Sequence, residues 1–186
     1  MASKIKVDTL ETANGSGSIT INNPINTAGI TSVTLGTSNF VAGVNAGNSI
    51  TSGGNYNTVV GDEAGTAITT GTRNTATGYG SLEDCTTGEH NSAFGLASLA
   101  SNTTADNNTA VGYAALNANT TADNNTAVGY SSLGANTTGA DNTAVGQGAL
   151  DANTTASYNT AVGASALTSN TTGTQNVASG VNSLQD

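Results

Sequence analysis

Apolar and polar residues repeat along most of this chain with a fixed period of 17 residues. The pentapeptide Asn-Thr-Ala-Val-Gly at residues 108–112 has a counterpart at every seventeenth position from Asn57 to Asn176, and no insertion interrupts the eight units. A preliminary copy, Asn39–Gly43, begins 18 residues before Asn57. A short, constant period is typical of a solenoid, in which each unit forms one turn and buries its apolar side chains against its neighbours.

Each position of the unit has its own residue type when the asparagine is counted as position 1. Position 5 is Gly in all eight units, position 9 is Leu in seven, and positions 13 and 14 are both Thr in all seven complete units. A fixed glycine indicates a bend, asparagine suits corners and can form side-chain ladders, and the leucine is the large side chain that must be buried. The predicted core and corner residues are Leu99, Leu116, Leu133, Leu150 and Leu167, Gly95, Gly112, Gly129, Gly146 and Gly163, and Asn108, Asn125, Asn142 and Asn159.

The length of the unit selects the fold class. Seventeen residues are enough for two strands of about five residues and two corners, whereas helical repeats are longer and disfavour so much Gly, Asn and Thr. We therefore predict an all-β fold, a parallel β-solenoid or β-roll over residues 39–186, with eight regular turns that span about 38 Å.

A second apolar row is predicted on the outside of this solenoid. Successive strand residues point to opposite faces, so Val111 points outward if Ala110 points inward. The position-4 residues concerned are Phe94, Val111, Val128, Val145 and Val162. Because one Leu and one Ala per turn make a thin core, and because an exposed apolar stripe favours a partner, we predict a closed homotrimer, intertwined or side by side, in which these residues form the interface.

Residues 1–38 lack the 17-residue period. Short alternating stretches and an Asn-Gly turn signal at residues 14–15 predict a small β segment there. Two interpretations remain open, because the segment is either an attachment domain for other proteins or a cap for the end of the solenoid. The attachment candidates are Lys4, Ile5, Lys6 and Val7.

The charge distribution argues against several partners. The net charge is −9, and residues 39–186 hold one cation, Arg73, against ten acidic residues. Nucleic-acid binding needs a basic surface, and an anionic membrane surface repels an acidic one. The sequence shows neither a signal peptide nor an apolar run long enough to span a membrane, so we expect synthesis in the cytosol without membrane insertion.

Candidate catalytic and metal-binding residues are few. Cys85, the single cysteine, replaces Asn at position 12, and nothing places His90 beside it as a base. Acidic side chains between residues 62 and 123 offer oxygen ligands for calcium, but a calcium-binding nonapeptide is missing and solvated turns are the simpler interpretation. We predict no enzyme, no metal site and no cofactor.

Three tyrosines share position 6, namely Tyr79, Tyr113 and Tyr130. Aromatic rings in a row can stack on the apolar faces of sugars, or they can pack between chains. Of these two interpretations we favour packing between chains.

Two stretches resemble known proteins. The segment Asn108–Leu116, Asn-Thr-Ala-Val-Gly-Tyr-Ala-Ala-Leu, resembles the head repeat of trimeric autotransporter adhesins, which implies a trimeric left-handed parallel β-roll over residues 39–186. This chain departs from that family in its longer repeat and in the lack of a signal peptide, a coiled-coil stalk and a C-terminal membrane barrel. Its opening, Ser3–Leu10, resembles the start of many tail-fibre and appendage proteins of bacteriophages.

Together these resemblances imply a structural virion protein, made in the host cytoplasm. We expect a trimeric phage fibre or spike that joins other virion proteins through its N-terminal segment and contacts a host surface glycan or protein. One alternative is a capsid decoration or head-fibre protein. Another is an ice-binding β-solenoid that uses its paired threonines, although adjacent threonines point to opposite faces and only one row can face ice. A polysaccharide-cleaving enzyme is disfavoured, because a 17-residue turn is too thin to form a wide groove with convergent carboxylates.

Overall fold

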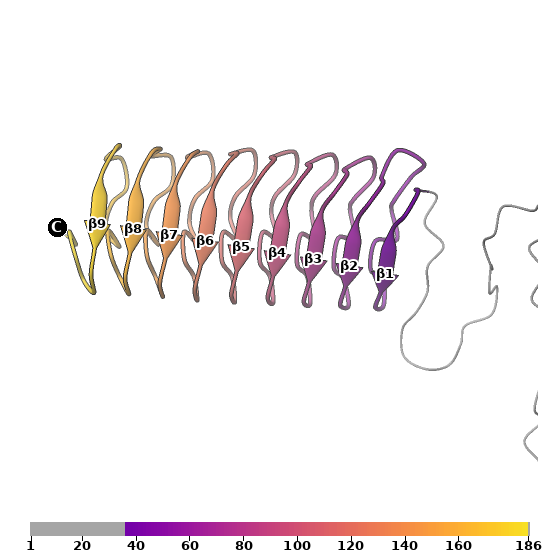
Figure 1. Ribbon diagram of the computed structural model, residues 1–186, viewed down its shortest axis with the longest axis horizontal. Coiled ribbons are helices and arrows are strands. Elements are labelled where there is room, and N and C mark those ends of the chain that lie inside the picture. The colour runs from indigo at the N-terminus through magenta and orange to yellow at the C-terminus, as the bar shows by residue number, and fades with distance from the viewer. Residues whose placement is uncertain (1–35, 186) are drawn as a thin grey trace, which may run out of the picture.

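The computed structural model describes residues 36–185 as one solenoid of nine short strands, with no helix in that range (Figure 1). The strands are β1 (Phe40–Ala42), β2 (Thr58–Val60), β3 (Thr75–Thr77), β4 (Ser92–Phe94), β5 (Thr109–Val111), β6 (Thr126–Val128), β7 (Thr143–Val145), β8 (Thr160–Val162) and β9 (Val177–Ser179). The predicted N-terminal β segment, with Lys4, Ile5, Lys6 and Val7, lies outside the described residues.

All nine strands form one parallel sheet in chain order, so β1 and β9 lie at its two ends (Figure 1). The register equals the sequence repeat: in the β5–β6 pair, Thr109 faces Thr126 and Val111 faces Val128. Each residue therefore lies beside its counterpart in the next turn. The predicted all-β parallel solenoid is confirmed.

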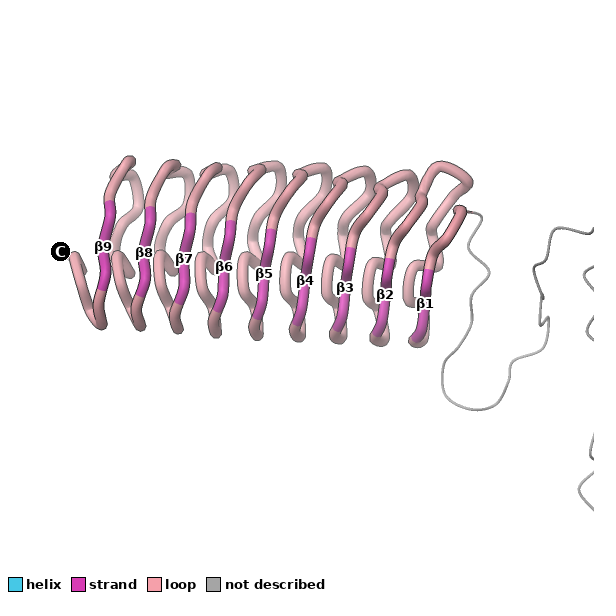
Figure 2. Tube along the Cα trace, in the orientation of Figure 1, coloured by secondary structure: helices cyan, strands magenta, loops and turns pink. Residues whose placement is uncertain are grey.

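Each turn contains one strand of three residues instead of the two longer strands that we predicted (Figure 2). The reason lies in the corners, where residues such as Ala114, Leu116 and Asn124 have φ between 51° and 62°, a left-handed conformation that interrupts extended backbone. The threonine segment still joins successive turns, since the backbone N–H and the hydroxyl of Thr103 both donate to the carbonyl oxygen of Thr120, at 2.9 and 3.0 Å.

The solenoid encloses a narrow core that is built mainly from positions 3, 8 and 9, where position 8 holds a buried Ala or Ser through most of the stack. Ala110 and Leu116 are fully buried, and the same holds for their counterparts through most of the stack. The structure places the five predicted core leucines inside; Leu99, Leu116, Leu133 and Leu150 are 0% exposed and Leu167 is 5% exposed. The leucines adopt positive φ, which is unfavourable for a bulky residue, so burial of the side chain must offset backbone strain in the six turns from Leu82 to Leu167.

The first two turns fill the core in a different way, which the sequence analysis missed. Position 9 is Gly47 in the first turn and Gly65 in the second, and the large side chain comes from position 12, where Ile50 and Ile68 are buried. A Cβ atom on Gly65 would lie 2.8 Å from Cδ1 of Ile68. The sequence does contain a signal for this replacement of one core side chain by another, because Gly at position 9 and Ile at position 12 occur together in both turns.

Two ladders of asparagine side chains run along the axis. In the position-1 ladder, the backbone N–H of Asn125 donates to Oδ1 of Asn108 at 2.9 Å, and this contact recurs from Asn39 to Asn176. In the position-12 ladder, Nδ2 of Asn119 donates to Oδ1 of Asn102 at 3.0 Å. Between residues 36 and 185 no buried side-chain nitrogen or oxygen lacks a hydrogen-bond partner. The ladders thus satisfy the buried amides, whose desolvation would otherwise destabilise so thin a core.

The position-5 glycines form the predicted bend. Gly95, Gly112, Gly129, Gly146 and Gly163 have φ between 133° and 137°, which L-residues with a Cβ rarely adopt. Each of them also packs its backbone directly against the glycine of the next turn.

Candidate self-association surface

The outer side of the sheet carries positions 2 and 4 of every turn, and we call this surface the strand face. Position 3 between them is buried, so the strand residues alternate as expected from the pleat. The structure places all five predicted interface residues on the strand face. Phe94, Val111, Val145 and Val162 are 36–42% exposed and Val128 is half-buried.

The strand face has no charged residue at position 2 or position 4 in any of its nine turns, although the chain carries a net charge of −9. Position 2 holds a hydroxyl in seven successive turns, which are those of Thr58, Thr75, Ser92, Thr109, Thr126, Thr143 and Thr160. Depletion of charge over a continuous surface with exposed apolar side chains is typical of the centre of a protein–protein interface.

All seven aromatic residues of the protein lie on or beside this face, and none lies in the core. They occupy positions 2, 4, 6 and 17, and each is at least 42% exposed. They are Phe40, Tyr56, Tyr79, Phe94, Tyr113, Tyr130 and Tyr158. Aromatic side chains usually supply much of the buried area of a core, whereas here all seven are exposed, so we take the strand face and its flanking rows as the candidate contact surface.

Sequence reasoning identified the position-6 tyrosines but missed the aromatic residues at position 17. Tyr56 and Tyr158 precede a strand by two residues, and both are exposed, at 56% and 60%. The guanidinium of Arg73 lies 5.6 Å from the ring centroid of Tyr56 in the same row. Because φ at Tyr56 and Tyr158 is 60° and 63°, position 17 is a left-handed corner, and its side chains lie beside the strand face and not on it.

The rings of Tyr113 and Tyr130 are stacked, with centroids 5.2 Å apart and planes 9° apart. Each ring therefore covers one face of the other. The facing sides of the two rings are unavailable to a sugar, and one face of each ring is left for stacking on another group.

The acidic side chains contribute to the stack of turns. Oδ1 of Asp106 accepts the backbone N–H of Glu89 at 2.7 Å, and Oδ1 of Asp123 accepts that of Asp106 at 2.8 Å. Within residues 36–185 no group of three or more His, Cys, Asp or Glu side chains is arranged to hold a metal ion. The acidic row therefore has a structural explanation in its contacts with backbone amides.

Cys85 takes the place of an asparagine in the position-12 ladder. Its thiol donates to the carbonyl of Gly88 at 3.7 Å, and its sulfur accepts from Nδ2 of Asn102 at 3.9 Å. Burial raises the pKa of the Cys85 thiol to about 11. His90 lies at the surface, 3.9 Å from Glu89. A buried thiol that remains protonated is a poor nucleophile, so Cys85 is explained by packing.

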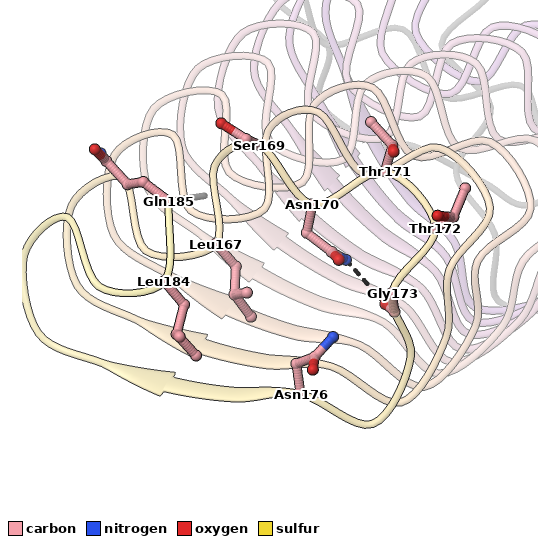
Figure 3. A pocket seen from close by; sticks show the side chains of 9 residues that line it. All are labelled: Leu167, Ser169, Asn170, Thr171, Thr172, Gly173, Asn176, Leu184 and Gln185. Carbon is pink, nitrogen blue, oxygen red and sulfur yellow. Dashed lines mark hydrogen bonds between the residues drawn. The ribbon is translucent and has the colours of Figure 1, made fainter.

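A cavity of about 260 Å³ opens at the last described turn (Figure 3). Leu167 and Leu184 line it, together with Asn170, whose Nδ2 donates to the carbonyl of Gly173 at 3.0 Å. The lining includes the same repeat positions that form the core further along the stack. This cavity is therefore the uncovered end of the solenoid interior and has no ionisable side chain in its lining.

No protein-family model matches the chain, and neither a curated protein nor a solved structure does. In the described part of the chain, no helix is long and apolar enough to cross a membrane.

Proposed function

We propose that this chain is the shaft of a homotrimeric virion fibre or spike, in which three copies pack through their strand faces. The observation that carries the proposal is the strand face itself, which is free of charge in an acidic protein, carries both phenylalanines and is flanked by the five tyrosines. A solenoid of identical turns supplies length without a thick core, which is the requirement of a shaft.

The strand face extends along the whole stack of turns. Nine strands at the usual spacing extend about 38 Å, and the three residues of each strand span about 10 Å, which together give about 380 Å² per chain. This is about half of the roughly 800 Å² that a stable interface buries on each partner, and in a trimer each chain contacts two partners. Burial of the strand face would therefore provide apolar burial that the thin core of a single chain lacks.

A closed trimer would bury all of its strand faces. A cyclic arrangement of three copies brings each strand face to a shared axis and leaves the charged positions outside, whereas an open arrangement leaves apolar surface exposed to further copies. The resemblance of residues 39–186 to the head repeats of trimeric adhesins supports the number three.

The virion context is supported by the resemblance of Ser3–Leu10 to the start of phage appendage proteins. In this proposal residues 1–38 attach the fibre to other virion proteins, and the free end contacts a host surface glycan or protein. Antibody labelling of this chain in electron micrographs of the virion tests the assignment. Label on the tail supports a tail fibre, label on the head selects a capsid decoration or head-fibre protein, and unlabelled particles contradict a virion role.

Truncation of the chain tests the attachment role separately. Protein in which a new solubilising cap replaces residues 1–38 should still trimerise but should no longer join virions. Normal incorporation of the truncated protein would show that attachment lies elsewhere.

Ice binding is the second candidate function, because the strand face presents rows of hydroxyl and methyl groups at a regular spacing. In the part of the chain that the structure describes, the position-2 hydroxyls, such as those of Thr109 and Thr126, form no hydrogen bond within the chain, whereas position-13 hydroxyls such as that of Thr103 are bonded to a carbonyl. A thermal-hysteresis assay separates the candidates, since a strand face buried in a trimer is unavailable to ice. Shaping of ice crystals at micromolar protein would favour ice binding over the fibre.

A further inference from the structure

Tyr113 and Tyr130 form a ring pair that the fold holds in place before any reaction. They occupy position 6 of successive turns, are stacked at 5.2 Å, and are 51% and 56% exposed. Backbone hydrogen bonds fix their spacing, since the N–H of Ser131 donates to the carbonyl of Tyr113 at 3.0 Å and the N–H of Gly129 donates to that of Val111 at 2.8 Å. Among residues 36–185, no other pair of rings is stacked.

We propose that Tyr113 and Tyr130 are an oxidative cross-linking site, at which hydrogen peroxide and a haem peroxidase join the two rings into dityrosine within one chain. Each phenol gives up one electron and one proton to form a phenoxyl radical. The two radicals form a carbon–carbon bond between ring carbons next to the oxygens, and the ring hydrogens at those carbons move to the oxygens. The two electrons and two protons reduce one peroxide molecule to two water molecules. The inference goes beyond the fibre proposal and does not depend on it.

Proximity explains why these two tyrosines should couple with each other. Two radicals on rings that already lie in contact combine far faster than two radicals that must meet by diffusion. Both side chains are about half exposed, so rotation about their side-chain bonds can bring the reacting carbons together. Both rings lie beyond the position-5 bend, outside the strand face, where a small oxidant reaches them.

The other tyrosines are less suited to the reaction. In their rows, Tyr79 has Asp62 and Leu96 as neighbours and Tyr158 has Asp141 and Gln175, so neither has an aromatic partner. Tyr56 lies beneath the guanidinium of Arg73, whose positive charge opposes the removal of an electron from the ring. The cross-link is therefore expected at one place in the described chain.

A bond between Tyr113 and Tyr130 would close a loop of one repeat and tie two successive turns of the shaft together. Covalent closure of such a loop restricts the unfolded chain, so the oxidised protein should melt several degrees higher than the untreated protein. The consequence for a fibre is a shaft that resists separation of its turns in an oxidising environment.

The test is to treat the full chain with hydrogen peroxide and horseradish peroxidase and to measure dityrosine fluorescence, intact mass and denaturing gel mobility. We expect a product of single-chain size that has lost two hydrogens, with the cross-link mapped to the peptides of Tyr113 and Tyr130. Tyr113→Phe and Tyr130→Phe should each abolish this product while keeping the stacked ring and the folded circular-dichroism spectrum, and Tyr79→Phe should keep it. Equal product from Tyr113→Phe and the wild type, products found only between chains, or no dityrosine at all would each overturn the proposal.

Discussion

Gly112 packs against the backbone of Gly129 so closely that a Cβ atom on Gly112 would lie 2.5 Å from the carbonyl oxygen of Gly129. Two separate restrictions meet at this position, because φ of Gly112 is also +133°. Close approach of backbones and positive φ are both conditions that only glycine satisfies without strain. The invariance of position 5 within the chain thus follows from the stacking of turns.

Substitution of this glycine should destabilise the solenoid strongly. Gly112→Val combines a clash with a β-branched side chain in a strained conformation, so the free energy of unfolding should fall by well over about 1 kcal/mol. Tyr113→Ala, at the exposed neighbouring position, should cost less. Gly180→Val is the matched control, since φ of Gly180 is +121° but nothing lies within 4 Å of its Cβ position. Thermal melting of the three variants measures the difference, and equal melting temperatures would show that position 5 is not a forced bend.

Removal of one asparagine from the position-1 ladder should measure how much its hydrogen bond contributes to the free energy of unfolding. Asn125→Ala leaves the buried N–H of Asn142 without its acceptor at 3.0 Å, which should lower the free energy of unfolding by about 1–3 kcal/mol. Asn124→Gly is the control, because Asn124 is the exposed neighbour of Asn125 and has a positive φ that glycine adopts readily. This variant should have little effect on the free energy of unfolding. Urea denaturation compares the two, and a neutral Asn125→Ala variant would argue against the ladder as a source of stability.

In the second turn Ile68 at position 12 fills the core space that a leucine at position 9 fills in later turns. Mutations at Gly65 and Ile68 should therefore be coupled in their effect on stability. Gly65→Leu alone places a Cβ atom 2.8 Å from Cδ1 of Ile68 and should be destabilising, by about 1–3 kcal/mol. The double variant Gly65→Leu/Ile68→Asn reproduces the later turns, so its loss should be smaller than the sum of the two single losses. Additive losses in this double-mutant cycle would mean that the two positions fill the core independently.

Deletion of a whole unit should be tolerated better than deletion of half a unit. Removal of residues 125–141 joins Asn124 to Asn142 and keeps every position in register, so the protein should shorten by about 4.8 Å and remain trimeric. Removal of residues 125–132 places inward residues beside outward ones and should abolish cooperative folding. Small-angle scattering and thermal melting distinguish the two outcomes, and comparable damage from both deletions would contradict a solenoid built of independent turns.

The sequence was sufficient for the period, the parallel stack and the direction of each strand residue, because Ala110 and Val111 differ so clearly in size and the pattern recurs in every turn. It was insufficient for the strand content of each turn. Residues such as Leu116 do not favour positive φ by type, so the left-handed corners that interrupt the second predicted strand are set by packing and are invisible in the residue pattern.

The candidate surface was predicted in part. Repetition at position 4 identified the row of Val111 and Val128, whereas Phe40, Tyr56 and Tyr158 occur at positions whose other members are mostly polar. Only the stack of turns shows that these scattered aromatic residues lie on the strand face or beside it. The sequence also could not show the role of Cys85. In the structure its sulfur accepts a hydrogen bond from Asn102 and takes the place of an asparagine in the position-12 ladder.

A charge on the strand face should disrupt assembly. Val128→Asp would place three carboxylates near one axis without partners, so the trimer should dissociate, while Thr138→Asp, which adds the same charge at exposed position 14, should leave it intact. Sedimentation velocity of the two variants gives the comparison. Unchanged assembly of the Val128→Asp protein would exclude the strand face as the interface.

The mass of the folded protein in solution tests the central claim most directly. Light scattering coupled to size exclusion should give about three times the chain mass of 18.1 kDa at micromolar concentration, because the thin core gains the burial it lacks when strand faces meet. A stable, folded particle with the mass of a single chain under the same conditions would contradict the trimer, and with it the fibre that we propose.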